Sequence, residues 1–138
     1  MLKKTLLICV VLFLFANTGC SGNIKVSGRV TFTDGEPVNF GTVCFETEKN
    51  TYTGRLDDNG NYSVGDRKDG AGIPAGEYVV WLSGTMLVEE GEKKGEDNYE
   101  IIETERVHPK YTLPDAKTLK FEVKKGGNNK FDFKVERP

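Results

Sequence analysis

The sequence predicts an all-β protein, folded as an antiparallel β-sandwich of about seven strands. Two observations support this fold class. Segments in which apolar and polar residues alternate recur roughly every ten residues, with glycine, proline and asparagine between them. No segment combines the length and the periodicity of an amphipathic helix. Two sheets of such strands would cover each other's apolar faces.

The first strands are expected at residues 24–33, 38–47 and 51–56. From Ile24 to Thr33 every second residue is apolar or glycine, which is typical of a strand with one buried face. In the second strand, Val43 and Phe45 are expected to face the core, and Cys44 faces the other way. Asn59 and Gly60 then predict a type I′ hairpin turn, because both residues tolerate positive φ.

The later strands are expected at residues 62–64, 78–82, 119–123 and 131–135. Both faces of the strand 78–82 are apolar, so it is expected to be covered on both sides, with Trp81 packed inside. The last two strands alternate instead, so that Phe121 and Phe133 are expected to face inward.

The N-terminal segment has the composition of a secretory signal. Lys3 and Lys4 precede an uninterrupted apolar run from residue 6 to residue 15, and small residues lead to Cys20. This run is shorter than the ~20 residues that span a bilayer as a helix. An ordinary secretory signal, in which the cysteine is incidental, is the alternative to a lipoprotein signal.

The junction 16–21 resembles a bacterial lipobox, in which a small residue precedes a cysteine that becomes the acylated N-terminus. Gly19 fits this pattern, and Asn17 stands where leucine is usual. The resemblance implies a signal peptide at 1–19, a lipid-anchored N-terminus at 20–23 with Cys20 as the palmitate-bearing residue, and a folded domain at 24–138. Ser21 resembles the outer-membrane-sorted pattern, so the expected location is the bacterial cell envelope, at an outer membrane facing the periplasm or the cell surface.

The charge balance argues against nucleic acid as a partner. Loss of Lys3 and Lys4 with the leader changes the formal net charge from −2 to −4. No basic stripe with interleaved aromatic residues is present. The expected partners are therefore the membrane, through the N-terminal lipid, and an envelope protein or polysaccharide.

Residues 84–107 form an acidic segment in which the strand pattern weakens, except for a short β segment expected at 99–104. Loops of this length in a compact domain are functional or mobile. Its carboxylates lack metal-ligand spacing and are interpreted as a solvated face, so no metal is expected. Tyr99 is the aromatic residue expected to be exposed there, and it is the candidate ligand-binding residue.

Catalysis and cofactor chemistry are not expected. The single histidine, His108, precedes a proline, and no nucleophile motif accompanies it. Cys44 has no cysteine partner in the folded part and is interpreted as a small strand residue, not as a reactive thiol.

Several turn and core residues resemble the carboxypeptidase regulatory-like domain. They are, in chain order, Gly28-x-Val30, Gly35-x-Pro37-Val38, Gly41-x-Val43-x-Phe45, Asp57-x-Asn59-Gly60-x-Tyr62 and Ile73-Pro74-x-Gly76-x-Tyr78-x-Val80. The later motifs His108-Pro109-Lys110-Tyr111 and Leu119-x-Phe121-x-Val123 resemble small planctomycete-type lipoproteins. The resemblance implies a transthyretin-like (prealbumin-like) sandwich without enzymatic activity.

The expected function is that of a lipid-anchored envelope protein with a structural or interaction role. The alternative is a carbohydrate-binding module that stacks sugars of an envelope polysaccharide on exposed aromatic rings. A sandwich strengthened by a Lys–Asn isopeptide bond is a third class, but no pattern brings the required lysine, asparagine and acid together.

Overall fold

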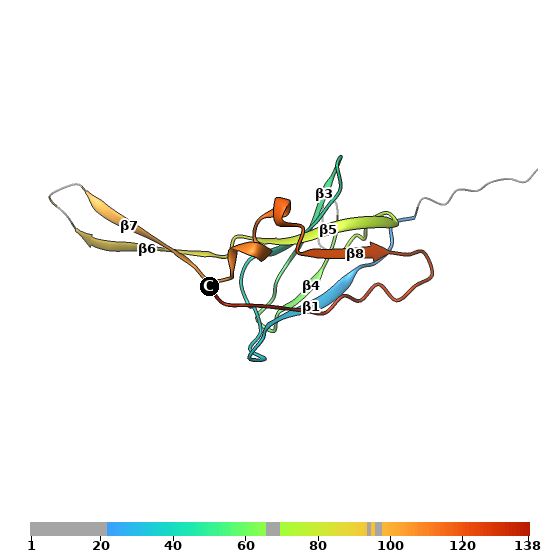
Figure 1. Ribbon diagram of the computed structural model, residues 1–138, viewed down its shortest axis with the longest axis horizontal. Coiled ribbons are helices and arrows are strands. Elements are labelled where there is room, and N and C mark those ends of the chain that lie inside the picture. Colours follow the sequence, from blue (N-terminus) through green and yellow to red (C-terminus); the bar gives the residue numbers. More distant parts are fainter. Residues whose placement is uncertain (1–21, 66–69, 94, 96–97) are drawn as a thin grey trace, which may run out of the picture.

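The computed structural model describes residues 22–65, 70–93, 95 and 98–138, and these form a compact body and a projecting two-stranded arm (Figure 1). Nine strands and two short 3₁₀ turns make up these parts. The strands are β1 (Ser27–Phe32), β2 (Thr42–Glu46), β3 (Thr51–Arg55), β4 (Asn61–Ser63), β5 (Gly76–Ser83), β6 (Met86–Lys93), β7 (Tyr99–Glu105), β8 (Leu119–Val123) and β9 (Phe133–Val135). The 3₁₀ turns are η1 (Pro109–Tyr111) and η2 (Pro114–Ala116).

The body is a β-sandwich, which confirms the predicted fold class. One sheet has the strand order β3-β2-β5-β8 and is antiparallel throughout. The other has the order β4-β1-β9. In this second sheet β1 and β9 run parallel, which differs from the antiparallel arrangement expected from the sequence.

The inner faces of the two sheets share one hydrophobic core, and the alternation read from the sequence identifies its members. Phe45 is fully buried at its centre. Its ring centroid lies 5.9 Å from that of Tyr78, 6.2 Å from those of Tyr62 and Phe131, and 6.3 Å from that of Phe121. The core therefore joins strands β2, β4, β5 and β8 with the segment that enters β9.

The segment 57–61 turns as predicted, but with a different geometry. Gly60 has φ of 78°, whereas Asn59 is not among the described residues with positive φ, so the turn is not type I′. The Gly60 N–H donates to the Asp57 carbonyl at 3.0 Å, and the Asp57 N–H donates to the Asn61 carbonyl at 3.0 Å. This pattern is typical of a type I turn followed by a glycine bulge. The chain also changes sheets here, since β3 pairs with β2 and β4 pairs with β1.

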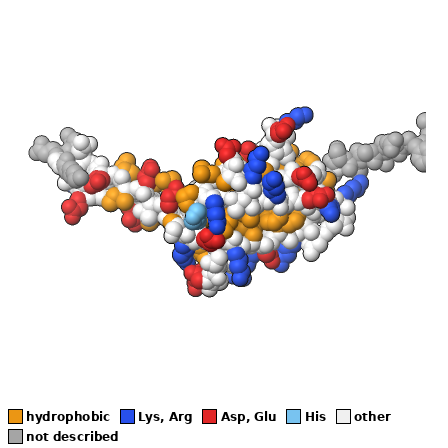
Figure 2. Space-filling model, viewed as in Figure 1, with side chains coloured by type: hydrophobic (Ala, Val, Ile, Leu, Met, Phe, Trp, Pro, Cys, Tyr) orange, Lys and Arg blue, Asp and Glu red, His pale blue; other side chains and the backbone are white. Residues whose placement is uncertain are grey.

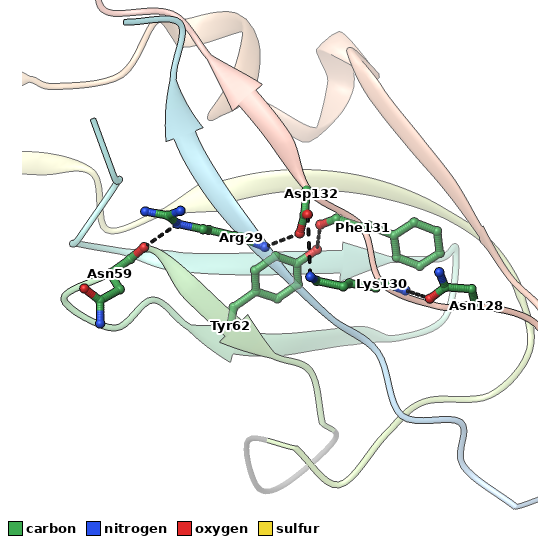
Figure 3. A network of polar contacts seen from close by, with 7 residues as sticks. All are labelled: Arg29, Asn59, Tyr62, Asn128, Lys130, Phe131 and Asp132. Carbon is green, nitrogen blue, oxygen red and sulfur yellow. Dashed lines mark hydrogen bonds and ion pairs between the residues drawn. The ribbon is translucent and has the colours of Figure 1, made fainter. Parts of the chain in front are cut away.

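A polar network holds the segment before β9 against β1 and β4 (Figure 3). The Tyr62 hydroxyl donates to the Phe131 carbonyl at 2.7 Å, and the Arg29 backbone N–H donates to Asp132 Oδ1 at 2.9 Å. Burial raises the pKa of Tyr62, so the phenol stays protonated and remains a donor. The close approach depends on Gly28, because a Cβ there would lie 1.9 Å from the Phe131 carbonyl oxygen.

The outer face of β5 is less covered than the sequence predicts. Tyr78, Val80 and Leu82 are buried, but Trp81 and Val79 are only half-buried. The expectation that Trp81 packs inside is therefore wrong. Its indole lies on the outer face, where Nε1 donates to Glu46 Oε2 at 2.7 Å. This hydrogen bond satisfies the polar atom and lets an amphipathic side chain occupy a partly exposed position.

Candidate functional site

The arm formed by β6 and β7 is the candidate functional site. Figure 1 shows it extending from one end of the body, away from the end where the described chain begins. Within the described strands, β6 and β7 pair only with each other. A two-stranded hairpin in water is marginally stable at best, because it has no third strand or helix to cover either face. The arm is therefore a surface that lacks a covering layer within the described chain.

The register of the arm places most of its large apolar side chains on one face. Three cross-strand pairs define this face: Met86 with Glu105, Val88 with Glu103, and Glu90 with Ile101. Tyr99 lies two residues before Ile101 on the same strand. Because side chains alternate along a strand, these residues share a face, which we call the arm face. Apolar and acidic side chains face each other across its two strands.

The arm face is the more exposed of the two faces. Ile101 is 65% exposed, Val88 61%, Tyr99 55% and Met86 45%. The opposite face carries Leu87 and Ile102, which are 38% and 46% exposed. An apolar patch of this kind, interspersed with charge, is typical of an interaction surface.

Tyr99, the ligand-binding residue predicted from the sequence, lies on this arm face. The Lys93 Nζ atom is 5.9 Å from the centroid of its ring. The sequence did not predict β6, and it therefore missed Met86 and Val88 as neighbours of the tyrosine. The run Met86-Leu87-Val88 was the signal, since it is followed by polar residues and then by Tyr99-Glu100-Ile101.

The other described tyrosines are not accessible for sugar stacking. Tyr52, Tyr62, Tyr78 and Tyr111 are all buried. Among the described tyrosines, only Tyr99 presents its ring to solvent as a stacking surface.

A trough of about 840 Å³ lies on the outer face of the sheet β3-β2-β5-β8. Its floor includes Val79 and Lys120, and its walls come from the β2–β3 turn at 47–49 and from η2. Glu46, Glu48 and Lys117 also line it, so the trough carries both signs of charge. Its open, mixed-charge surface selects no single ligand chemistry.

The two residues considered for catalysis have structural roles. His108 Nδ1 accepts the Lys110 backbone N–H at 3.2 Å and caps η1. Cys44 is buried on β2, and its Sγ lies 3.5 Å from Ser83 Oγ. Burial raises the pKa of the Cys44 thiol, which disfavours the reactive thiolate. Both observations agree with the structural interpretation of these residues.

Two further observations concern metals and membranes. In residues 22–65, 70–93, 95 and 98–138, no three or more metal-ligating side chains form a cluster. Across the same described ranges, no helix is long and apolar enough to cross a bilayer. Cys20, the predicted lipidation site, lies outside the described residues.

No family model, curated protein or solved structure matches the chain. The resemblance to the carboxypeptidase regulatory-like domain therefore stays a prediction from its turn and core residues.

Proposed function

We propose that the protein is a lipid-anchored β-sandwich of the bacterial cell envelope, without catalytic activity, which binds an envelope partner through its arm. The lipid on Cys20 would hold the body close to the membrane, since only residues 21–23 separate that cysteine from the sandwich. The arm would reach away from the start of the body (Figure 1).

One observation carries this proposal: the arm exposes four large apolar side chains on one face, and no other described strand covers them. Burial of apolar surface contributes about 25 cal/mol per Å², so covering this face would stabilise a complex. A stability role within the monomer would require contacts with the body, whereas β6 and β7 pair only with each other among the described strands.

The lipid surface itself is a poor partner for the arm. The sequence from 86 to 105 contains eight acidic residues and two lysines, a net charge of −6. Anionic lipids repel such a segment, whereas basic segments are attracted to them. A protein surface that combines apolar and basic groups fits the arm better.

Binding of an envelope polysaccharide is the second candidate function, favoured by the exposed ring of Tyr99. Stacking on one ring gives limited affinity, and the surrounding carboxylates disfavour acidic polymers. Retention of the purified protein on cell-wall polysaccharide, lost in Tyr99→Ala, would favour this second function.

Site-specific photo-crosslinking in the native host tests the interaction role. With a photoreactive amino acid at Val88, on the arm face, we expect one or a few discrete protein adducts. The control places the same amino acid at Thr51, an exposed residue of β3 on the body. Absence of discrete adducts from Val88, or the same diffuse products from both positions, would contradict the proposal.

A further inference from the structure

The body has a surface that complements the arm, and it lies where the sandwich is open. β8 ends one sheet and β9 ends the other. Leu119, Phe121 and Phe131 are partly exposed between these two edges. The rings of Phe121 and Phe131 stack there with centroids 4.8 Å apart. We call these three side chains the seam.

Basic residues flank the seam. Lys120 and Lys124 come from the β8 side, and Lys130 and Lys134 come from the β9 side; all four are exposed. Figure 2 shows a band of hydrophobic side chains along the body, with basic side chains on both sides of it. Lys124 and Lys130 each lie near one carboxylate, at 3.7 Å and 3.9 Å, and such exposed pairs contribute little. Lys120 and Lys134 form no ion pair with any other described residue.

The charges of the two surfaces are opposite. Residues 86–105 carry a net charge of −6, whereas residues 119–134, which bear the seam, contain five lysines and two acidic residues, a net charge of +3. Each surface is an apolar strip bordered by one dominant sign of charge. Complementary potentials of this kind promote encounter and fix the orientation of a complex.

We propose that the arm face docks on the seam of a second copy of this chain. This inference rests on the proposed function, because it names the partner of the same arm. Met86, Val88 and Ile101 would cover Phe121 and Phe131 of the other copy. The glutamates of the arm would lie near the lysines that flank the seam.

The geometry favours a head-to-tail contact over an arm-to-arm contact. Two arms that meet face to face would bring together two surfaces of the same negative charge, which is repulsive. The eight residues of β6 span about 26 Å at about 3.3 Å per residue. The arm is therefore longer than the five-residue strand β8, along which it would lie in the other copy. The arm projects from one end of the body, whereas β8 runs along the body (Figure 1). The arm face and the seam of one molecule are therefore available to different neighbouring molecules. Such a contact is heterologous and generates rings or filaments.

Thiol crosslinking between two tagged copies of the mature chain tests this contact. Cys20→Ala removes the lipid, and Cys44 is buried, so neither residue competes with an introduced thiol. One copy carries Val88→Cys on the arm, and the other carries Lys120→Cys beside the seam. The matched control replaces Lys120→Cys with Thr51→Cys, an exposed residue on β3 at the opposite edge of the same sheet.

With a short bismaleimide we expect about tenfold more heterodimer from the Val88–Lys120 pair than from the Val88–Thr51 pair, because docking raises the effective concentration of the two thiols. The yield should fall in about 0.5 M NaCl, where charges are screened beyond roughly 5 Å. Equal yields from both pairs, predominant Val88–Val88 products, or no crosslinking would overturn the inference. Discrete Val88 photo-adducts with a different protein would then leave the proposed function standing, and their absence would refute it as well.

Discussion

Gly28→Ala destabilises the protein by about 3–5 kcal/mol, because the new methyl group requires the backbone of a neighbouring segment to move. The added Cβ would lie 1.9 Å from the Phe131 carbonyl oxygen and 2.8 Å from the Tyr62 hydroxyl. The hydrogen bond between these two groups would be strained or lost, leaving a buried hydroxyl without its acceptor. Such a loss is a large fraction of the stability of a domain of this size.

Chemical unfolding of the mature chain, made soluble by Cys20→Ala, measures this effect. Gly22→Ala is the matched control, since its Cβ would meet no atom within 4 Å. That control should change the free energy of unfolding by no more than about 0.5 kcal/mol. If Gly28→Ala were equally harmless, the close packing of β1 against the segment before β9 would be wrong.

We expect Cys20→Ala to move the protein from the membrane fraction to the soluble fraction. Each buried methylene of an acyl chain contributes about 0.8 kcal/mol, and two or more chains are needed for stable anchoring. Loss of the proposed acylation site should therefore remove nearly all of the membrane affinity. Fractionation of cells followed by detection of the protein measures the change.

Cys44→Ala is the matched control for this experiment, because Cys44 is buried in the sandwich and should not affect membrane association. A Cys20→Ala protein that stays in the membrane with its leader attached would contradict the lipobox interpretation. A wild-type protein that is cleaved and soluble would instead show that residues 1–19 are an ordinary secretory signal.

The core could be predicted from the sequence because it depends on local alternation. Val26, just before β1, Val30 and Phe32 on β1, and Val43 and Phe45 on β2 are buried as the period of two requires. Alternation states which residues share a face. It contains no information on which non-adjacent strands pair, and for this reason the parallel pairing of β1 with β9 could not be foreseen.

Two wrong predictions have particular causes. Trp81 is apolar by composition, but its indole nitrogen can bond to Glu46 at the surface, so an apolar pattern on both faces did not require burial. The Asn59–Gly60 pair satisfied the residue preferences of a type I′ turn. At this point, however, the chain passes from one sheet to the other, and a type I turn with a bulge changes the direction of the chain.

The arm was predicted only in part because its acidic residues obscure the strand pattern. The β7 segment was expected at 99–104 and is observed at Tyr99–Glu105, whereas β6 was missed. In β6, Met86, Leu87 and Val88 are consecutive, so they do not alternate with polar residues. Both faces are exposed, and alternation therefore has no buried side to reveal.

Replacement of residues 86–105 by Asn-Gly tests the central claim, that the arm is a binding surface and not a part of the fold. Met86 and Glu105 are paired, so Thr85 and Arg106 lie close enough for a two-residue turn. The free energy of unfolding of the shortened protein, measured by denaturant titration, should lie within about 0.5 kcal/mol of the parent value. A loss of more than about 2 kcal/mol, comparable to removal of a core side chain, would show that the arm stabilises the body and would contradict the account.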